Sequence, residues 1–204
     1  MLLFLDLISP LPEFSIIEEN KLIFNKKINE NTEEKLSDNI FNKYLEIDKI
    51  LNLSKNLKKV CVTLGPGSYT SLRVGSSFLS GLIISKNLLF SPLSVLDILK
   101  FQDNESKANK TGVYLNSSND QNFFCWMEPS DNIKYKKIEK TYLEIPKNIN
   151  TILFNENKLT TKNTTIPQIS FSFKEIVIKN NKEIDFKKNK LIEPIYISNN
   201  KILN

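Results

Sequence analysis

The first part of the chain shows short apolar runs that give way to a helical period. Apolar runs at 2–8, 14–18 and 21–27 are separated by prolines and by a polar pair, which predicts a meander of three strands. From residue 36 onward, apolar side chains recur every third or fourth position behind a short acidic segment. This pattern predicts a helix over 32–50 with Asn31 as its N-cap.

A second strand-and-helix pattern leads to a polar break. Strands are predicted at 60–64 and 88–90, and helices after the first of these strands and over 94–101. The run 102–110 contains one alanine and no larger apolar residue. Such a run predicts a boundary between a first lobe at 1–101 and a second lobe at 111–204.

The second lobe carries weaker but similar signals. Strands are predicted at 112–115, 122–127, 133–138 and 151–154. The segment 173–186 fits a helix or a strand, and its pattern does not decide between them. Strands and helices alternate in the first part of the chain and strands dominate the second, which predicts a fold of the α/β class. From its length, the chain could form one large domain or two small lobes.

The stretch 60–84 concentrates residues that are scarce elsewhere. Four of the five glycines lie in it, Gly65, Gly67, Gly75 and Gly81, together with the only arginine, Arg73. In a lysine-rich chain, a single arginine indicates a need for a planar group with several donors. Because Arg73 falls in the first turn of a predicted helix, where a cation opposes the dipole, we expect a specific partner. That partner is either a carboxylate such as Asp6 or Asp97 or a second subunit.

The glycine loop between strand and helix has three candidate roles. Gly65 and Gly67 supply turn geometry, and Ser68 or Thr70 can cap the following helix. A strand, a glycine loop and a helix N-terminus together can hold an anion. The loop matches neither the Walker A motif nor the dinucleotide fingerprint. A structural role is favoured over contact with a nucleotide or with a partner's ligand.

The helix after this loop has two different faces. Its apolar face is formed by Leu72, Val74, Phe78, Leu79 and Leu82. The opposite face carries Ser77, Ser80, Gly81 and Ile84, and no charge lies between Arg73 and Lys86. Small uncharged residues permit the close approach of another helix. We expect this face to be covered, either within the monomer or, as the favoured alternative, by another subunit.

Composition excludes several classes of function. The chain has no histidine, which excludes Ser-His-Asp and Cys-His nucleophiles and histidine-ligated metals, so no catalytic or metal-binding residue is predicted. Cys61 and Cys125 lie in apolar runs and are expected to be buried thiols. The net charge of +5 comes from scattered lysines, which fits a solvated surface better than a nucleic-acid groove. The apolar run at 2–5 is too short for a signal peptide or a membrane span, which predicts a cytoplasmic protein.

Residues 65–75, GPGSYTSLRVG, resemble the signature of the TsaB (YeaZ) family, with Ser71 in place of the usual glycine. The resemblance implies a two-lobed actin-like and Hsp70-like (ribonuclease H-like) fold with a reduced second lobe. It also implies a non-catalytic scaffold for making threonylcarbamoyladenosine in tRNA. The expected partners are the transferase TsaD, in a heterodimer, and the ATPase TsaE. Binding of tRNA is expected only through the complex, and a homodimer through the same helices is the alternative assembly.

Two departures from the family pattern bear on ligands. The family's first strand ends in Asp-Thr-Ser-Thr, whereas this chain has Asp6-Leu7-Ile8-Ser9 and so lacks two hydroxyl groups. We therefore expect no cofactor in the isolated chain and ATP only within the complex. Asn116-Ser117-Ser118 replaces an Asp-Ala-Arg-like segment, so no role transfers to it, while Pro194-Ile195-Tyr196 matches the family's Pro-x-Tyr. An autonomous ATP-binding, kinase-like protein of the same fold remains the alternative, and a protease is disfavoured by the lack of histidine.

Overall fold

The first half of the chain forms a mixed sheet of five strands. We describe residues 1–102, 110–117, 121–128, 132–138, 145–160, 165–188, 192–198 and 201–203 of a computed structural model. The strands are β1 (Leu2–Asp6), β2 (Glu13–Glu18), β3 (Lys21–Lys27), β4 (Lys59–Thr63) and β5 (Leu89–Leu93), in the spatial order β3-β2-β1-β4-β5. The inner strand β1 pairs antiparallel with β2 and parallel with β4.

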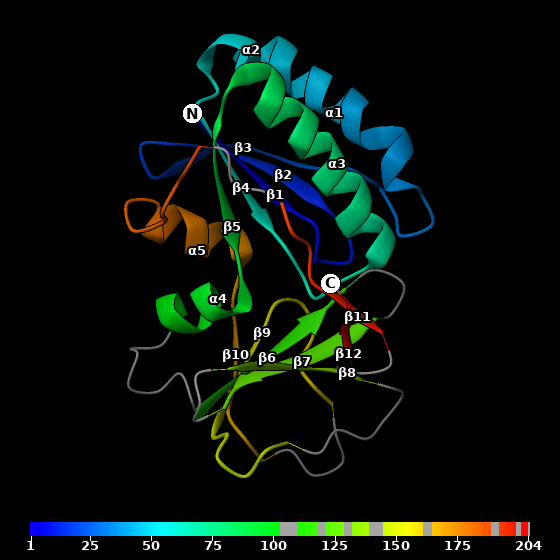
Figure 1. Ribbon diagram of the computed structural model, residues 1–204, viewed down its shortest axis with the longest axis vertical. Coiled ribbons are helices and arrows are strands. Elements are labelled where there is room, and N and C mark those ends of the chain that lie inside the picture. Colours follow the sequence, from blue (N-terminus) through cyan, green and yellow to red (C-terminus); the bar gives the residue numbers. More distant parts are fainter. Residues whose placement is uncertain are drawn as a thin grey trace.

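Helices cover one face of this sheet. They are α1 (Leu36–Leu51), the short α2 (Leu53–Asn56) and α3 (Tyr69–Lys86), and α1 and α3 run side by side on the outer face of the sheet (Figure 1). Leu3 and Leu5 of β1 face these helices, and Ile40 and Ile47 of α1 are buried against the same core. Helical spacing of the apolar residues therefore produces the packing that the sequence predicts.

The start of α1 differs from the sequence-based prediction. The helix begins at Leu36, and Lys35 occupies the N-cap position without a side-chain cap. Asn31 does accept hydrogen bonds from the backbone N–H groups of Glu33 and Glu34, at 3.0 and 3.2 Å. It closes a turn ahead of the helix, so the prediction of Asn31 as the cap is wrong. Because the Asn31 side chain binds these backbone N–H groups in a turn, residues 32–35 form that turn and not the first turn of the helix.

The second sheet repeats the arrangement of the first. Its strands are β6 (Thr111–Asn116), β7 (Asn122–Met127), β8 (Ile133–Ile138), β9 (Thr151–Phe154) and β10 (Gln168–Ser170), in the order β10-β9-β6-β7-β8. The inner strand β6 pairs antiparallel with β7 and parallel with β9, just as β1 does with β2 and β4. Each sheet is thus a meander of three strands extended by two parallel strands. The predicted two-lobed α/β fold is confirmed.

The second lobe is reduced because irregular chain covers the outer face of its sheet. Within the described residues, no helix connects β8 to β9 or β9 to β10. Ile149 and Leu159, from the segments on either side of β9, pack instead against Tyr114 and Phe124 of the sheet.

Two helices between the sheets join the lobes. Helix α4 (Val95–Gln102) packs on β6, α5 (Phe173–Asn180) packs on β1, and the two helices contact each other (Figure 1). One buried cluster includes Phe4 of β1, Val113 of β6 and Val177 of α5. The lobes therefore share a continuous core. The predicted boundary at 102–110 lies, apart from residues 102 and 110, outside the described residues.

Segments after α5 return to both lobes. The open question over 173–186 is resolved as the helix α5 followed by turns, after which Lys187 and Phe90 exchange two backbone hydrogen bonds of 2.9 Å. The hairpin of β11 (Tyr196–Ser198) and β12 (Lys201–Leu203) adjoins β8. None of the described helices is both long and apolar enough to cross a lipid bilayer.

Gly75 in α3 is fixed by its contact with Leu7. A Cβ atom at Gly75 would lie 2.3 Å from Cδ2 of Leu7, whose side chain is fully buried. We predict that Gly75→Ala lowers the free energy of unfolding by about 1–3 kcal/mol through overpacking. Leu7→Ala alone should cost about 2–5 kcal/mol. The double variant should lose less than the sum, because each change relieves the other.

Urea denaturation of the two single variants and the double variant measures this coupling. Gly81→Ala is the matched control, because a Cβ atom there has no neighbour within 4 Å and the change should stabilise the helix by about 1 kcal/mol. Additive losses for Gly75 and Leu7 would contradict the packing that we describe.

Candidate functional site

The glycine loop is shaped by a close approach of the C-terminal segment. Gly65 has φ of +103°, and a Cβ atom on it would lie 2.7 Å from the carbonyl oxygen of Ile195. The backbone N–H of Ile195 donates a hydrogen bond of 2.7 Å to the Leu64 carbonyl. Only glycine combines this φ with so close a neighbour. The Pro-x-Tyr segment and the glycine loop are therefore two sides of one contact.

The second half of the loop contacts the second lobe. The Ser68 N–H donates a hydrogen bond of 2.9 Å to Oγ of Ser117, and a Cβ atom on Gly67 would lie 3.4 Å from the same oxygen. Oγ of Ser68 accepts from the Ser71 N–H at 3.4 Å, so Ser68 is the cap of α3, while Thr70 lies exposed in the first turn. The Ser68 N–H that could hold an anion thus has a protein partner. Anion contact by the loop stays a prediction.

Asp6 organises the end of β1. Its Oδ1 accepts from the backbone N–H groups of Ile8 and Ser9, at 2.9 and 3.3 Å, and from Oγ1 of Thr63 at 3.2 Å. Burial raises the pKa of the Asp6 carboxyl to about 6, although hydrogen bonds from Ser9 and the backbone act in the opposite direction. Leu7 and Ile8, which replace the family's hydroxyl residues, are buried in the core. The loop therefore offers a buried carboxyl group and apolar packing.

A cleft of about 300 Å³ lies between the end of β1 and the second lobe. Its polar lining includes Asp6, Ser9, Glu13, Asn155 and Lys174. Lys174 Nζ pairs with Oε1 of Glu13 at 2.8 Å, and Nδ2 of Asn155 donates to Oγ of Ser9 at 3.3 Å. Several of the polar groups that line the cleft are therefore bound to one another.

The outward face of α3 is exposed. Arg73, Ser77 and Gly81 are exposed, Ser80 is half-buried, and 82% of Ile84 is accessible. Burial of this face within the monomer is therefore not observed for the described residues. Helix α1 adds further apolar area to the same side of the sheet, with 57% of Phe41 and 37% of Leu45 exposed. Together these side chains of α3 and α1 form a surface that we call the α1–α3 face.

Arg73 bonds to its own helix. Its Nη2 donates a hydrogen bond to the Tyr69 hydroxyl, and its Cζ lies 4.4 Å from the centroid of the Tyr69 ring. The Tyr69 ring in turn packs on Tyr196, with the centroids 4.6 Å apart. The suggested pairing of Arg73 with Asp6 or Asp97 is wrong. Asp6 bonds within its own loop, and Asp97 accepts from Ser94.

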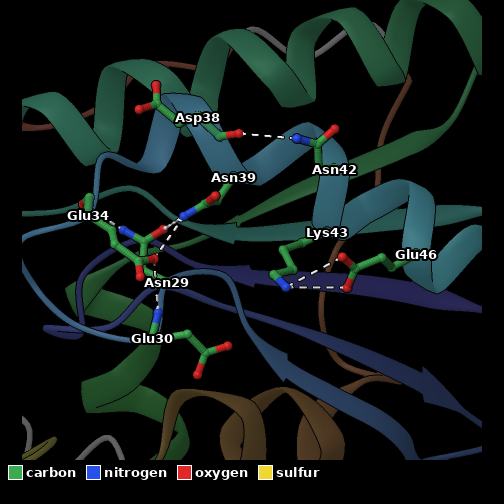
Figure 2. Close-up of polar contacts among 8 residues, drawn as sticks. All are labelled: Asn29, Glu30, Glu34, Asp38, Asn39, Asn42, Lys43 and Glu46. Carbon is green, nitrogen blue, oxygen red and sulfur yellow. Dashed lines mark hydrogen bonds and ion pairs between the residues drawn. The ribbon is translucent and has the colours of Figure 1, made fainter.

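A polar network fixes the chain ahead of α1 (Figure 2). Asn39 Nδ2 donates to Oδ1 of Asn29 at 3.2 Å and to Oε2 of Glu34 at 2.9 Å, and Asn29 Nδ2 donates to the Glu34 carbonyl at 2.8 Å. Farther along the helix, Lys43 forms an ion pair of 3.4 Å with Glu46. The network holds the N-terminal end of α1, and with it one end of the α1–α3 face.

Three residues of the lobe junction were not found by sequence reasoning. Thr63, Ser117 and Asn155 all bond to the loop after β1 or to the glycine loop. Thr63 lies near the end of the predicted strand 60–64, and Ser117 and Asn155 come shortly after the predicted strands 112–115 and 151–154. Polar residues at the carboxyl ends of parallel strands meet at one edge of a sheet. That signal was present in the chain for all three.

The raised pKa of Asp6 predicts a pH-dependent stability. Because the pKa is about 6 in the folded chain and 3.8 without the fold, the folded state binds the proton more tightly. The stabilisation that comes from protonated Asp6 is fully present below about pH 4 and is lost as pH rises through 6. Between these limits, the unfolding free energy of the wild type should fall relative to Asp6→Asn by about 3 kcal/mol.

Denaturation curves across this pH range for the wild type and Asp6→Asn provide the measurement. Asp48→Asn is the control of opposite sign. Partial burial opposes ionisation of Asp48, but hydrogen bonds from Ser54 lower its pKa, so its contribution is lost as pH falls. Parallel stability curves for the wild type and Asp6→Asn would contradict the prediction.

Comparison with known proteins identifies the family. Residues 30–203 match the family described as "TsaD: tRNA N6-adenosine threonylcarbamoyltransferase". YeaZ from Pseudomonas aeruginosa superposes with a TM-score of 0.59 at 12% identity, covering 96% of this chain and 99% of that one. A structure described as an uncharacterized protein with similarity to peptidase YEAZ from Pseudomonas aeruginosa gives a TM-score of 0.55 at 13% identity, covering 97% and 99%. No curated protein sequence matches. The fold is therefore the actin-like fold of YeaZ, as the glycine-loop signature implies, and the chain belongs to the TsaD family of tRNA-modification proteins.

Proposed function

We propose that this chain is a non-catalytic, cytoplasmic scaffold subunit that supports the transferase TsaD in forming threonylcarbamoyladenosine beside the tRNA anticodon. The observation that carries the proposal is the α1–α3 face, which is exposed and uncharged between Arg73 and Lys86 on α3. The chain has a net charge of +5, yet this face of α3 has no lysine between Arg73 and Lys86 and exposes 82% of Ile84. An exposed apolar face of this kind is suited to a protein partner.

The shape of the face fits a helix-to-helix contact. Ser77 and Gly81 are small, so a helix of the partner can approach the α3 backbone closely. Phe41 and Leu45 of α1 provide apolar side chains that can fill pockets on the partner. At the start of α3, the Arg73 guanidinium uses one donor on Tyr69 and keeps others for hydrogen bonds across the interface.

The cleft supports a role without catalysis. Leu7 and Ile8 put apolar side chains where the family has hydroxyl groups, and the Ser68 N–H is bonded to Ser117. The chain has no histidine to act as a base or a metal ligand. Accordingly we assign no cofactor to the isolated chain, and ATP enters only as a ligand of the complex.

The proposed assembly follows from the same face. TsaD binds it in a heterodimer, and the ATPase TsaE joins the complex, which alone contacts tRNA. A homodimer through the α1–α3 face is the competing assembly, because it would cover the same apolar side chains. The two assemblies are mutually exclusive if they use this one surface.

One prediction of the proposed function concerns nucleotide binding. The isolated chain should show no tight binding of ATP with magnesium in calorimetry, because two hydroxyl donors are absent and cleft groups are bonded to each other. A dissociation constant at or below about 1 μM, or roughly −8 kcal/mol, would instead favour the autonomous kinase-like alternative.

The second prediction concerns Gly81, where the structure allows folding and assembly to be separated. A side chain at Gly81 meets nothing within 4 Å, so Gly81→Glu should keep or slightly raise the melting temperature of the free chain. In a close-packed interface, the same change buries an unpaired charge, at a cost of several kcal/mol. Co-elution with TsaD on size exclusion should therefore be lost.

Thr160→Glu is the matched control, because it adds the same charge at an exposed position of the second lobe. It should leave co-elution unchanged. Normal binding by Gly81→Glu would exclude the α1–α3 face as the TsaD contact, whatever its effect on melting.

A further inference from the structure

The two lobes use the same hydrogen bond at the ends of their inner strands. In the first lobe Leu5 pairs with Val62, and in the second Tyr114 pairs with Phe154. The residues that follow Val62 and Phe154 are Thr63 and Asn155. Oγ1 of Thr63 accepts a hydrogen bond of 2.8 Å from the N–H of Leu7, two residues after Leu5. In the same way, Oδ1 of Asn155 accepts a hydrogen bond of 2.7 Å from the N–H of Asn116, two residues after Tyr114. The repeated sheet order thus extends to individual bonds at the strand ends.

Two further bonds cross between the lobes in a reciprocal way. Oγ of Ser9, in the loop after β1, accepts from Nδ2 of Asn155, just after β9, at 3.3 Å. Oγ of Ser117, just after β6, accepts from the N–H of Ser68, in the loop after β4, at 2.9 Å. In both cases the acceptor is a serine hydroxyl that follows the inner strand of one lobe, β1 or β6. The donor follows the strand that pairs in parallel with the inner strand of the other lobe, β9 or β4.

The Ser68–Ser117 bond is buried and the Asn155–Ser9 bond is partly buried. Ser9, Ser68 and Ser117 have 8%, 3% and 3% of their surface exposed. Asn155 uses its second Nδ2 hydrogen on the Asn116 carbonyl at 2.9 Å, and its Oδ1 on the Asn116 N–H. Its orientation is therefore fixed before it reaches Ser9. Loss of the Ser117 hydroxyl would leave the buried Ser68 N–H without its partner, which costs more than the bond itself contributes. Loss of the Ser9 hydroxyl removes the partner of the partly buried Asn155 amide.

We propose that this reciprocal pair of bonds, the hydroxyl latch, holds the two lobes closed across the cleft between them. Ser9 and Asn155 both line the cleft of about 300 Å³, so release of the latch widens that cleft. Helices α4 and α5 share one core with both sheets and keep the lobes joined when the latch is open. The latch adds to this shared core by restricting motion between the ends of the two inner strands. This inference depends on the lobe junction and is independent of the proposed partner.

Distance measurements between the lobes test the latch. The labelled chain carries Lys55→Cys in the first lobe and Lys158→Cys in the second, both at exposed positions. The native Cys61 and Cys125 are fully buried and will not take a nitroxide under native conditions. Pulsed electron resonance should give a narrow distance distribution in this chain. Adding Ser9→Ala and Ser117→Ala together should broaden it and lengthen the mean.

Amide hydrogen exchange provides a second readout. In the Ser117→Ala chain, the Ser68 amide should exchange about five- to thirtyfold faster, the factors that correspond to 1–2 kcal/mol. Ser85→Ala is the control, because its hydroxyl donates to the Leu82 carbonyl within α3, away from the lobe junction. It should change neither the distances nor the exchange rate of Ser68.

The single variants Ser9→Ala and Ser117→Ala each remove one hydroxyl. They provide the test if the double variant fails to fold. Each should show a smaller broadening than the double variant. Distance distributions and Ser68 exchange that match the unmutated labelled chain in all of these variants would overturn the proposal.

Discussion

The contact between the glycine loop and the second lobe is the constraint on which the rest of this structure depends. Gly65 and Gly67 lack the Cβ atoms that would collide with the Ile195 carbonyl or crowd Ser117, so the loop can lie at the junction of the lobes. Ser68 then bonds to Ser117 with its N–H and caps α3 with its hydroxyl. The beginning of α3 is thereby fixed, and Gly75 seats the helix on Leu7. With one side of α3 held in this way, its other side faces outward.

Local sequence was sufficient for elements bounded by clear turn signals. The ranges 21–27, 122–127, 133–138 and 151–154 are strands with the predicted ends. It was insufficient where tertiary contacts decide the structure. Strand β10 has only three residues, too few to show a strand pattern, and it is a strand because it pairs with β9. At the start of α1, the turn closed by Asn31 competes with helix, and propensity alone does not reveal which conformation is adopted.

The candidate site divides along the same line. The uncharged side of α3 could be recognised from residue types at helical spacing, and the structure leaves that side exposed. That a partner covers it stays a prediction. The Arg73 contact with Tyr69 is a neighbour at i and i−4 on one helix, which the sequence permits but does not single out. The bonds of Ser117 and Asn155 join residues far apart in the chain. The position of these residues after strand ends could be read from the sequence, but the donor or acceptor that each meets depends on how the two sheets face each other.

Hydrogen–deuterium exchange of the chain with and without purified TsaD tests the central claim most directly, because it locates the contact without any substitution. We predict slower exchange at residues 41–45 of α1 and 73–84 of α3 in the presence of TsaD. The strands of the second lobe should exchange as they do in the free chain. Protection confined to the second lobe, or no protection when TsaD is in excess, would contradict the assignment of the α1–α3 face as the scaffold surface.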